Sequence, residues 1–334
     1  MSITVIKPGL LSTFQDAGRR GHQHLGVPVS GAMDNRAHRL ANLLAGNDAD
    51  EATLEITLTG PELRFDAPAC IAISGARLSP SLNGQAIPND RPLVVHAGDK
   101  LTFGARQSGV RAYLAWHGGI DVPTVLGSRS TYVRGSFGGL EGRALKKGDT
   151  LALCTSLREH DLQSLEHELW KIKIYLPAIL GLQPRVALRV MRGPHTGLFT
   201  EAAIENLFSA AYRASPDSER MGYRLQGPLL PLKQPTQLLS ESTSFGAIQV
   251  PADGQPIILM ADRQTTGGYA KIAHVATVDL PLVAQCLPGE TLKFTECTLE
   301  QAQRLDAQRD AAFDQLKQML APVRALLNGG SASL

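Results

Sequence analysis

The stretch LVVHAGDKLTFGARQSGVRAYLAW, residues 93–116, decides the fold class. It contains three short apolar or alternating runs, Leu93–Val95, Lys100–Phe103 and Arg111–Trp116, and the first two are joined by a glycine-centred reversal at Ala97-Gly98-Asp99. Short runs bounded by turn residues are typical of strands. We therefore expect meander-like β structure.

The same pattern extends from this stretch toward the N-terminus. Ile3–Ile6, Leu63–Phe65 and Cys70–Ile73 are apolar or alternating, and Asn83-Gly84 supplies the residues of a tight hairpin turn. One segment differs, because from Asp34 to Leu44 the apolar residues recur at helical spacing behind an aspartate that can act as an N-cap. The first half of the chain is thus expected to be β structure with one helix.

A short pattern of Gly, an acidic residue, any residue, Leu, any residue and an apolar residue occurs three times. Each copy predicts a turn that enters a strand. Together with other short echoes between the two halves, these copies predict two related β units. The three copies are Gly98–Phe103, Gly148–Leu153 and Gly289–Phe294.

The expected architecture is mainly β, with two related barrel units, a few short helices and a C-terminal helix. The charged region 158–185 differs in composition from its surroundings and predicts a partly helical connector. A short helix is expected over Leu198–Leu207, and Thr298 with Gln301 forms a capping box for the last helix. The expected boundaries are 1–157 for the N-terminal unit, 158–185 for the connector, 186–297 for the second unit and 298–327 for the C-terminal helix.

Composition and charge exclude several classes of protein. Of 334 residues, 43% are hydrophobic, which is enough for a buried core, and 32 glycines with 20 prolines argue against a helical bundle. A formal net charge of +2 gives no field that would attract nucleic acid or an acidic membrane. Since no apolar run approaches a membrane span and no signal pattern opens the chain, we expect a cytoplasmic protein.

Several widespread catalytic motifs are absent from the sequence. It contains no G-x-x-x-x-G-K-[ST] nucleotide loop, no H-E-x-x-H and no G-x-S-x-G. It also lacks a Met-Lys-Met acceptor, so any biotin would have to arrive on another chain. His22 and His24 have no third ligand in view and the four cysteines lie far apart, so no metal site is expected.

Three segments, 13–34, 118–131 and 261–269, combine glycines with polar side chains. Glycines let backbone N–H groups approach an anion or a carbonyl closely, while Arg and Asp orient polar substrate atoms. The same residues also suit a structural role, because Asp and Arg pairs pin loops and Thr-Thr-Gly-Gly forms a bulge or hairpin. Composition alone leaves both interpretations open.

The residues that carry a family resemblance are Gln15–Arg19, Gly26–Asp34, Ala41–Asn47, Leu54-Glu55, Gly118–Pro123, Leu126–Thr131, Arg220–Leu225, Gly246–Pro251 and Asp262–Tyr269. Together these blocks resemble the KipA / allophanate hydrolase subunit 2 family over about residues 3–297. Bacterial members of that family include the C subunit of a three-part 5-oxoprolinase. A related domain forms half of the carboxyltransferase unit of biotin-dependent urea carboxylase.

The resemblance implies a fold of cyclophilin-like β-barrels. It also implies that the chain is one subunit of a multi-subunit enzyme. The implied reaction is the ATP-dependent hydrolysis of 5-oxo-L-proline to L-glutamate. The implied partners are a KipI-like B subunit plus a lactam-utilisation type A subunit. Resonance makes the lactam resistant to water, so coupling to ATP is chemically sensible. Because the chain lacks a P-loop, ATP would be shared with or supplied through the partner subunits.

The resemblance implies roles for residues of the three polar segments. Candidate catalytic residues are Asp16, Asp262, Arg263 and Gln264, with either aspartate acting as a base or an orienter. Arg19, Arg129 or Arg263 would bind a substrate carboxylate or phosphate, and the backbone of 266–268 would stabilise a developing oxyanion. The candidate substrate-binding residues are Arg19, Ser128, Arg129, Ser130, Gln249, Thr265, Thr266, Gly267, Gly268 and Tyr269.

Two other functions fit the same family. One is carboxyl transfer to urea or a related amide, with carboxybiotin supplied by another chain. The other is KipA-like regulation, in which the chain binds a KipI-like inhibitor of a sensor kinase. The arginines and aspartates in the glycine-rich loops favour chemistry over regulation. A neighbouring gene for a biotin carboxylase or for an A subunit of the lactam-utilisation type would separate the two reactions.

Overall fold

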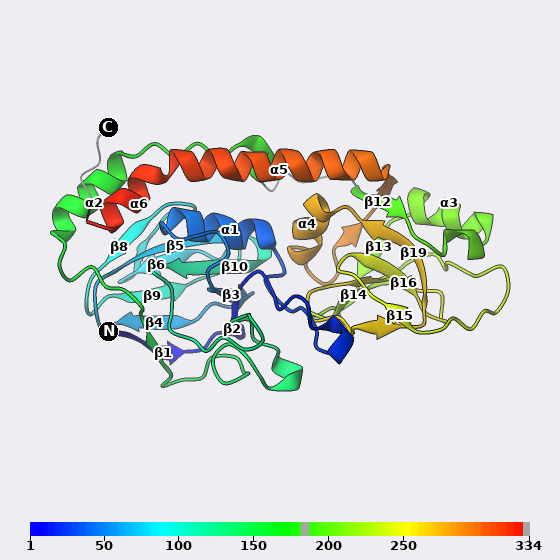
Figure 1. Cartoon of the computed structure of the whole chain (residues 1–334), viewed down its shortest axis with the longest axis horizontal. Helices are drawn as coiled ribbons and strands as arrows, with labels where there is room; N and C mark the ends of the chain where they lie inside the picture. Colours follow the sequence, from blue (N-terminus) through cyan, green and yellow to red (C-terminus); the bar gives the residue numbers. More distant parts are fainter. Residues whose placement is uncertain (182–186, 330–334) are drawn as a thin grey trace. The chain divides into compact units, whose positions relative to one another are not determined.

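The computed structural model describes residues 1–181 and 187–329. The chain divides into two compact units: the first contains residues 1–19, 34–180 and the segment from Ala312 on, and the second contains 20–33 and 181–311. The prediction of a mainly β protein with a few short helices and a C-terminal helix is confirmed (Figure 1). Among the described residues, no helix is both long enough and apolar enough to cross a bilayer.

The segment 20–33 differs from expectation, because it belongs to the second unit and not to the N-terminal one. The Gln23 side chain donates from Nε2 to the carbonyls of Thr243 and Thr265 at 2.9 and 2.8 Å, and Met33 is part of the second unit's core. The connector also differs, because its helix α2 (Leu162–Lys171) and the 3-10 turn η3 (Ala178–Leu180) belong to the first unit. The end of the connector and the expected start of the second unit at 186 lie outside the described residues.

The C-terminal helix begins as expected but is divided in two. Thr298 N donates to Gln301 Oε1 at 2.9 Å and Gln301 N donates to the Thr298 hydroxyl at 3.2 Å, which confirms the capping box. The expected single helix to residue 327 is interrupted at Leu320, giving α5 (Leu299–Met319) and α6 (Ala321–Leu327). Pro322 explains the break, because proline lacks the N–H that would continue the helical hydrogen bonds and is tolerated only in a first turn.

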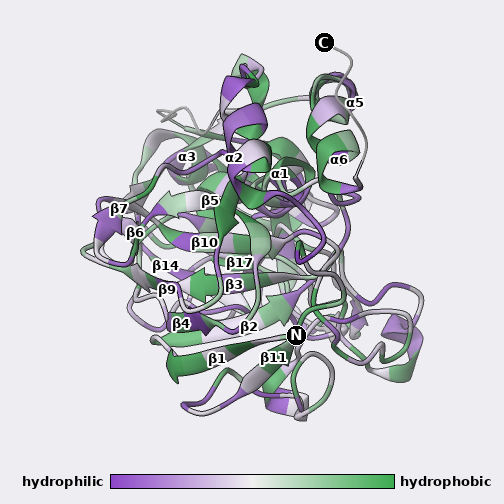
Figure 2. Cartoon of the chain, turned by 90° about the vertical axis from the view of Figure 1, so that its left-hand side faces the viewer, coloured by the Kyte–Doolittle hydropathy of each residue, from purple (hydrophilic) through white to green (hydrophobic). Residues whose placement is uncertain are grey.

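Within the described residues, the first unit contains a six-stranded sheet and a five-stranded sheet. Both contribute to one hydrophobic core that includes Val5, Leu63 and Trp116, each at most 1% exposed. Apolar residues run along β1, whereas the hairpin tip at β7 is hydrophilic (Figure 2). The six-stranded order is β11 (Thr150–Ala152), β1 (Ser2–Lys7), β4 (Glu62–Phe65), β9 (Lys100–Phe103), β6 (Pro80–Leu82) and β7 (Gln85–Ala86). The five-stranded order is β2 (Leu11–Gln15), β3 (Thr53–Thr57), β10 (Ser108–Trp116), β5 (Ala69–Arg77) and β8 (Leu93–Val95).

Helix α1 (Asn35–Leu44) packs across β5 and β10 (Figure 1). The Asp34 side chain accepts a hydrogen bond from Ala37 N at 2.9 Å, which confirms it as the N-cap. A fully buried polar layer lies between helix and sheet, in which the Tyr113 hydroxyl donates to Glu55 Oε2 at 2.7 Å and His38 Nδ1 lies 2.8 Å from the Thr53 hydroxyl. Burial lowers the pKa of His38 to about 4.

The described part of the second unit contains an eight-stranded sheet and a two-stranded ribbon. Its core includes Val190, Phe199, Tyr223 and Ile258, each at most 2% exposed. The sheet order is β20 (Thr291–Leu292), β13 (Tyr212–Ala214), β14 (Gly222–Gln226), β17 (Ile257–Leu259), β16 (Ala247–Val250), β19 (Ala270–Val275), β12 (Leu188–Arg192) and β21 (Phe294–Glu296). The ribbon pairs β15 (Glu241–Ser242) with β18 (Thr266–Gly267). The short helices are η1 (Gln23–Leu25), η4 (Thr196–Leu198), α3 (Glu201–Ser209), η5 (Thr277–Asp279) and α4 (Leu280–Ala284).

The three Gly-acid copies adopt one and the same turn. Gly98, Gly148 and Gly289 have φ values of 95°, 89° and 92°, in the region that favours glycine. In each copy the acidic side chain accepts a hydrogen bond from the backbone N–H three residues earlier, and a strand follows. The donor and acceptor pairs are His96 and Asp99 at 2.7 Å, Lys146 and Asp149 at 2.7 Å, and Leu287 and Glu290 at 2.9 Å.

Candidate functional site

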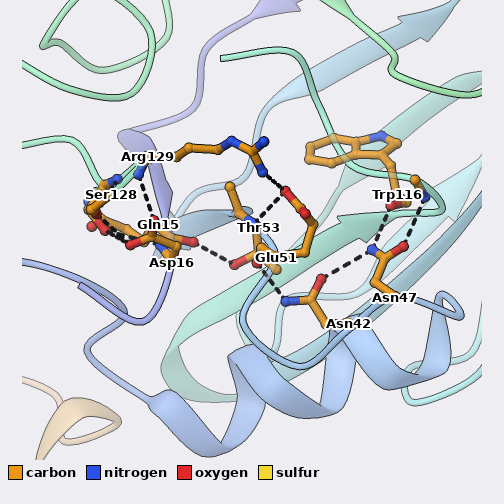
Figure 3. A network of polar contacts seen from close by, with 12 residues as sticks. Gln15, Asp16, Asn42, Asn47, Glu51, Thr53, Trp116, Ser128 and Arg129 are labelled. Atoms are coloured by element: carbon orange, nitrogen blue, oxygen red, sulfur yellow. Dashed lines mark hydrogen bonds and ion pairs between the residues drawn. The ribbon is translucent and has the colours of Figure 1, made fainter. Parts of the chain in front are cut away.

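In the first unit, the predicted site residues gather where β2 ends beside the loop 125–131 (Figure 3). Asp16 Oδ1 accepts hydrogen bonds from Gly18 N at 2.8 Å, the Ser128 hydroxyl at 2.7 Å and the Ser130 hydroxyl at 2.5 Å. Its Oδ2 accepts one from Arg129 N at 2.6 Å. Asp16 thus ties the loop to the end of β2.

These contacts bear on the two roles considered for Asp16. Burial would raise the pKa of its carboxyl, but hydrogen bonds from the hydroxyls of Ser130 and Ser128 and from the backbone of Arg129 and Gly18 outweigh burial, so the pKa is lowered. A carboxylate with a lowered pKa whose two oxygens both accept hydrogen bonds is a weak base. The geometry therefore favours Asp16 as an orienter of the loop, and it makes the two serines donors to Asp16.

The two arginines predicted here differ in accessibility. Arg19 is fully buried, donates from Nε to Val125 O and from Nη2 to Ser130 O, both at 2.8 Å, and lies 4.8 Å from the centre of the Phe137 ring. The guanidinium of Arg19 therefore fixes the loop 125–131 through its backbone carbonyls. Arg129 pairs through Nη1 with the Glu51 carboxylate, and its side chain is 36% exposed. Arg129 is therefore the arginine of this pair that can reach a dissolved anion.

A network of amides positions Glu51, the partner of Arg129 (Figure 3). Asn42 Nδ2 donates to Glu51 O at 2.7 Å, and Asn47 Nδ2 donates to Asn42 Oδ1 at 3.2 Å and to Trp116 O at 2.7 Å. Gly118 N donates back to Asn47 Oδ1 at 2.8 Å. Two sequence blocks, 41–47 and 118–123, are thus joined to hold one ion pair.

In the second unit, Asp262 and Arg220 form a buried ion pair. Arg220 Nε donates to Oδ2 at 2.8 Å and Nη2 to Oδ1 at 3.1 Å, and both side chains are 7% exposed. Arg220 Nη2 also donates to Gly31 O at 2.7 Å. Both carboxylate oxygens are engaged, and the pair links the segment 20–33 to the loop after Met260, which favours Asp262 as an orienter over a base.

Gln249 and Gln264, both predicted site residues, are brought together on one face of the second sheet. Gln249 on β16 is the register partner of Lys271 on β19, and antiparallel register partners project from the same face. Gln249 is 1% exposed, and its Oε1 accepts a hydrogen bond from Gln264 Nε2 at 3.1 Å. Its Nε2 has no hydrogen-bond partner among the described residues.

The segment 265–269 contains β18, one strand of the β15–β18 ribbon, beside these glutamines. Thr243 N donates to Thr265 O at 3.0 Å, and the Thr243 hydroxyl donates to Gln264 O. Gln23 holds the carbonyls of both Thr243 and Thr265, so the ribbon is anchored from two sides. Thr266 and Tyr269 are exposed, and Gly267 and Gly268 are half-buried. The segment is therefore both a hairpin-like structure and an accessible rim.

Lys271, Glu241 and His195 form an ionic cluster at the foot of the ribbon. Lys271 is 7% exposed, and its Nζ donates to Ser242 O at 2.8 Å and lies 3.1 Å from Glu241 Oε1. His195 Nδ1 accepts a hydrogen bond from Lys271 N at 3.1 Å, which leaves the ring proton on Nε2, 3.1 Å from the same Glu241 oxygen. The hydrogen bond and charge of Lys271 lower the pKa of Glu241 despite its partial desolvation.

Arg263 is 8% exposed and makes no carboxylate contact among the described residues. Its Nη1 donates to Met260 O at 3.4 Å, its guanidinium lies 6.0 Å from the centre of the Phe245 ring, and its Nε has no partner among the described residues. Burial lowers the pKa of Arg263 to about 10, and the charge of Asp262 opposes that shift only in part. A buried cation without an ion pair suits an anionic ligand group.

Several residues that complete these clusters are absent from the set predicted from the sequence. Arg220 lies in one of the blocks that carry the resemblance, but its partner Asp262 is distant in the sequence. Glu51 and Lys271 belong to no motif of their own, and they emerge only from the loop packing and from the register of β16 with β19. Sequence spacing offers no signal for them.

The chain is similar to known proteins over most of its length. The chain is 39% identical to the C subunit of 5-oxoprolinase from Escherichia coli, over 94% of this chain and 97% of that protein. It is 35% identical to the protein of the same name from Haemophilus influenzae, over 92% of this chain and 96% of that protein. Urea amidolyase of Saccharomyces cerevisiae is 35% identical over 94% of this chain, which spans only 18% of that protein.

A solved structure and a family model are also similar to this chain. The crystal structure of Kluyveromyces lactis urea carboxylase matches with a TM-score of 0.85 and 34% identity, covering 94% of this chain and 29% of that one. The sequence matches the family described as carboxyltransferase domain, subdomain A and B, over residues 25–296. These matches confirm the resemblance carried by the sequence blocks, and the chain belongs to the carboxyltransferase domain family, subdomains A and B.

Proposed function

We propose that this chain is the C subunit of an ATP-dependent 5-oxoprolinase, a complex that hydrolyses 5-oxo-L-proline to L-glutamate. The observation that carries the proposal is the similarity to two proteins named as the C subunit of 5-oxoprolinase, over 97% and 96% of their lengths. The similarity to urea amidolyase covers only 18% of that larger protein. A match over the full length of a relative supports an equivalent role more strongly than a match to one part of a longer enzyme.

The chemistry of a lactam explains why several subunits and ATP are needed. Amide resonance makes the ring resistant to water, and phosphorylation of the amide oxygen would weaken that resonance. The sequence has no P-loop, so the proposal places ATP in a site shared with or supplied through two partners, a KipI-like B subunit plus a lactam-utilisation type A subunit. The proposal includes a cytoplasmic location, where ATP is available.

The described residues supply binding and orientation for this reaction. Arg263, which is buried and has no ion pair within residues 1–181 and 187–329, and the partly exposed Arg129 suit the substrate carboxylate or a phosphate. In the proposal, Asp16 and Asp262 hold their loops in place through hydrogen bonds to both carboxylate oxygens. In the proposal, backbone N–H groups of the rim 266–268 stabilise a developing oxyanion.

A second function is favoured by the family match and by the fold of K. lactis urea carboxylase. In that alternative the chain takes part in carboxyl transfer to urea or a related amide. Biotin would supply the carboxyl group from another chain, since this sequence has no biotinyl acceptor motif. The polar face with Gln249 and Gln264 fits a ureido ring as well as a lactam, because both present an amide edge.

A substrate screen separates these functions. The chain is combined with the products of its neighbouring genes and supplied with ATP and with 5-oxo-L-proline, urea or allophanate. We expect glutamate from 5-oxoproline and no consumption of the other two. Bicarbonate- and biotin-dependent use of urea would instead support carboxyl transfer, and tight binding to a KipI-like protein without any turnover would support a KipA-like regulatory role.

A further inference from the structure

Gln249 carries an amide group that is buried and incompletely hydrogen-bonded. The side chain is 1% exposed, and Nε2 has no partner among the described residues. Its neighbours on β16, Ile248 and Val250, belong to the hydrophobic core. An unpaired buried donor lowers stability, and an apolar side chain of similar size would avoid that cost. A glutamine at this position therefore indicates a role in binding.

The contact between the two glutamines leaves a donor group and an acceptor available. Gln264 Nε2 donates to Gln249 Oε1, so both N–H groups of Gln249 remain available as donors, and the Oε1 of Gln264 remains available as an acceptor. Two side-chain amides joined in this way offer a donor and an acceptor whichever way the pair is oriented. This combination is complementary to an amide whose C=O and N–H lie on the same side. Lactams and cyclic ureas have that edge, whereas ketones, esters and carboxylates lack the N–H.

Gly267 keeps the edge of the Gln249 amide clear of side chains. A Cβ atom on Gly267 would lie 2.9 Å from Gln249 Nε2 and 3.4 Å from Gln264 Nε2. Because Gln249 is 1% exposed, binding to its amide in this proposal requires β18 to move outward. The β15–β18 ribbon pairs only two residues on each side, and the hydrogen bonds of Gln23 to Thr243 and Thr265 are among the contacts that this movement must break.

A cation lies beside this edge, and a second adjoins Gln264 in the chain. Lys271 is the register partner of Gln249, and its ammonium has two acceptors, Ser242 O and Glu241, for three N–H groups. Arg263 is buried next to Gln264 in the sequence without a carboxylate contact among the described residues. We propose that Gln249 and Gln264 recognise the cis-amide edge of a small cyclic amide, and this inference rests on the amide chemistry of the proposed function.

The test replaces one amide at a time in the reconstituted complex. Gln249→Met and Gln264→Met remove the free donor and the free acceptor, and Gln226→Met changes an exposed glutamine of the same unit. We expect KM for 5-oxo-L-proline to rise about 10-fold or more in the first two variants and to stay unchanged in the control. The midpoint of urea unfolding should not fall in Gln249→Met, because the substitution removes an unpaired buried donor. Normal KM in both site variants would overturn the inference while leaving the proposed function intact.

A binding experiment decides the inference even if the complex turns over no 5-oxoproline. The isolated chain is titrated with 2-pyrrolidinone, with 2-imidazolidinone and with cyclopentanone, which has the ring and the carbonyl but no N–H. Preference for either cyclic amide over the ketone, lost in Gln249→Met, supports the inference and shows whether a lactam or a cyclic urea is preferred. Equal affinity of the wild-type chain for all three compounds, or no binding, would overturn it.

Discussion

The guanidinium of Arg220 holds both carboxylate oxygens of Asp262 inside the second unit, at 2.8 and 3.1 Å. Removing one partner of a buried pair leaves the other charge uncompensated, and such changes cost about 3–5 kcal/mol. We therefore expect Arg220→Met to lower the free energy of unfolding by about that amount, measured by urea denaturation. The matched control is Arg192→Met, which breaks the exposed pair with Glu296 and should cost less than about 1 kcal/mol. Equal losses in the two variants would contradict the role given to the buried pair.

Gly267→Ala tests the space beside the Gln249 amide. The added Cβ would lie 2.9 Å from the end of a flexible side chain, so the amide should shift and the fold should lose less than about 1 kcal/mol. Activity should fall, because the displaced amide no longer meets the substrate. Gly197→Ala is the control, since a Cβ there meets nothing within 4 Å. Steady-state kinetics in which both variants behave like the wild type would refute the assignment.

Asp16→Asn tests whether Asp16 orients its loop or acts as a base. The variant loses charge-assisted hydrogen bonds and should be less stable by about 2 kcal/mol at pH 7. The folded-state pKa of Asp16 is lowered from 3.8, so its contribution is present above that value and is lost as pH falls below it. The stability difference between wild type and variant should therefore shrink below about pH 4. If Asp16 only orients the loop, the pH profile of kcat/KM keeps its shape in the variant. If Asp16 is a base, the variant loses the acidic limb of that profile.

His38 makes the first unit sensitive to mild acid. Burial lowers the pKa of His38 from 6.5 to about 4. Between these two pH values the unfolded chain therefore binds a proton at His38 that the folded chain does not. Its contribution to stability is present above pH 6.5 and is lost as pH falls toward 4, by on the order of 3 kcal/mol. We expect His38→Leu to reduce this pH dependence when urea unfolding is followed from about pH 7.5 to about pH 4. His96→Leu, at an exposed position, should keep the wild-type slope, and an unchanged slope in His38→Leu would exclude His38 as its source.

Features set by neighbouring residues could be predicted from the sequence. The Gly-acid turns depend on one glycine with positive φ and on one acidic side chain three residues from its donor. The caps formed by Asp34 and by Thr298 with Gln301 are likewise local. Each needs only side chains within one turn of chain, so the residue types alone indicate it.

Features that depend on long-range packing could not be predicted in this way. The segment 20–33 joins the second unit through side-chain hydrogen bonds of Gln23 and Arg220 to distant backbone carbonyls. Lys271 becomes the neighbour of Gln249 only through the register of β16 and β19, which shifts between Ile248 and Gln249. Local patterns do not fix such a register, because one bulge changes which residues share a face.

In the proposal, ring opening of 5-oxo-L-proline requires this chain, and an experiment that omits the chain tests this directly. Glutamate and ADP formed from 5-oxo-L-proline and ATP are measured with the complete set of subunits and with this chain alone omitted. We expect coupled formation of both products in the complete mixture and no glutamate without the chain. Undiminished glutamate formation in its absence would contradict the claim.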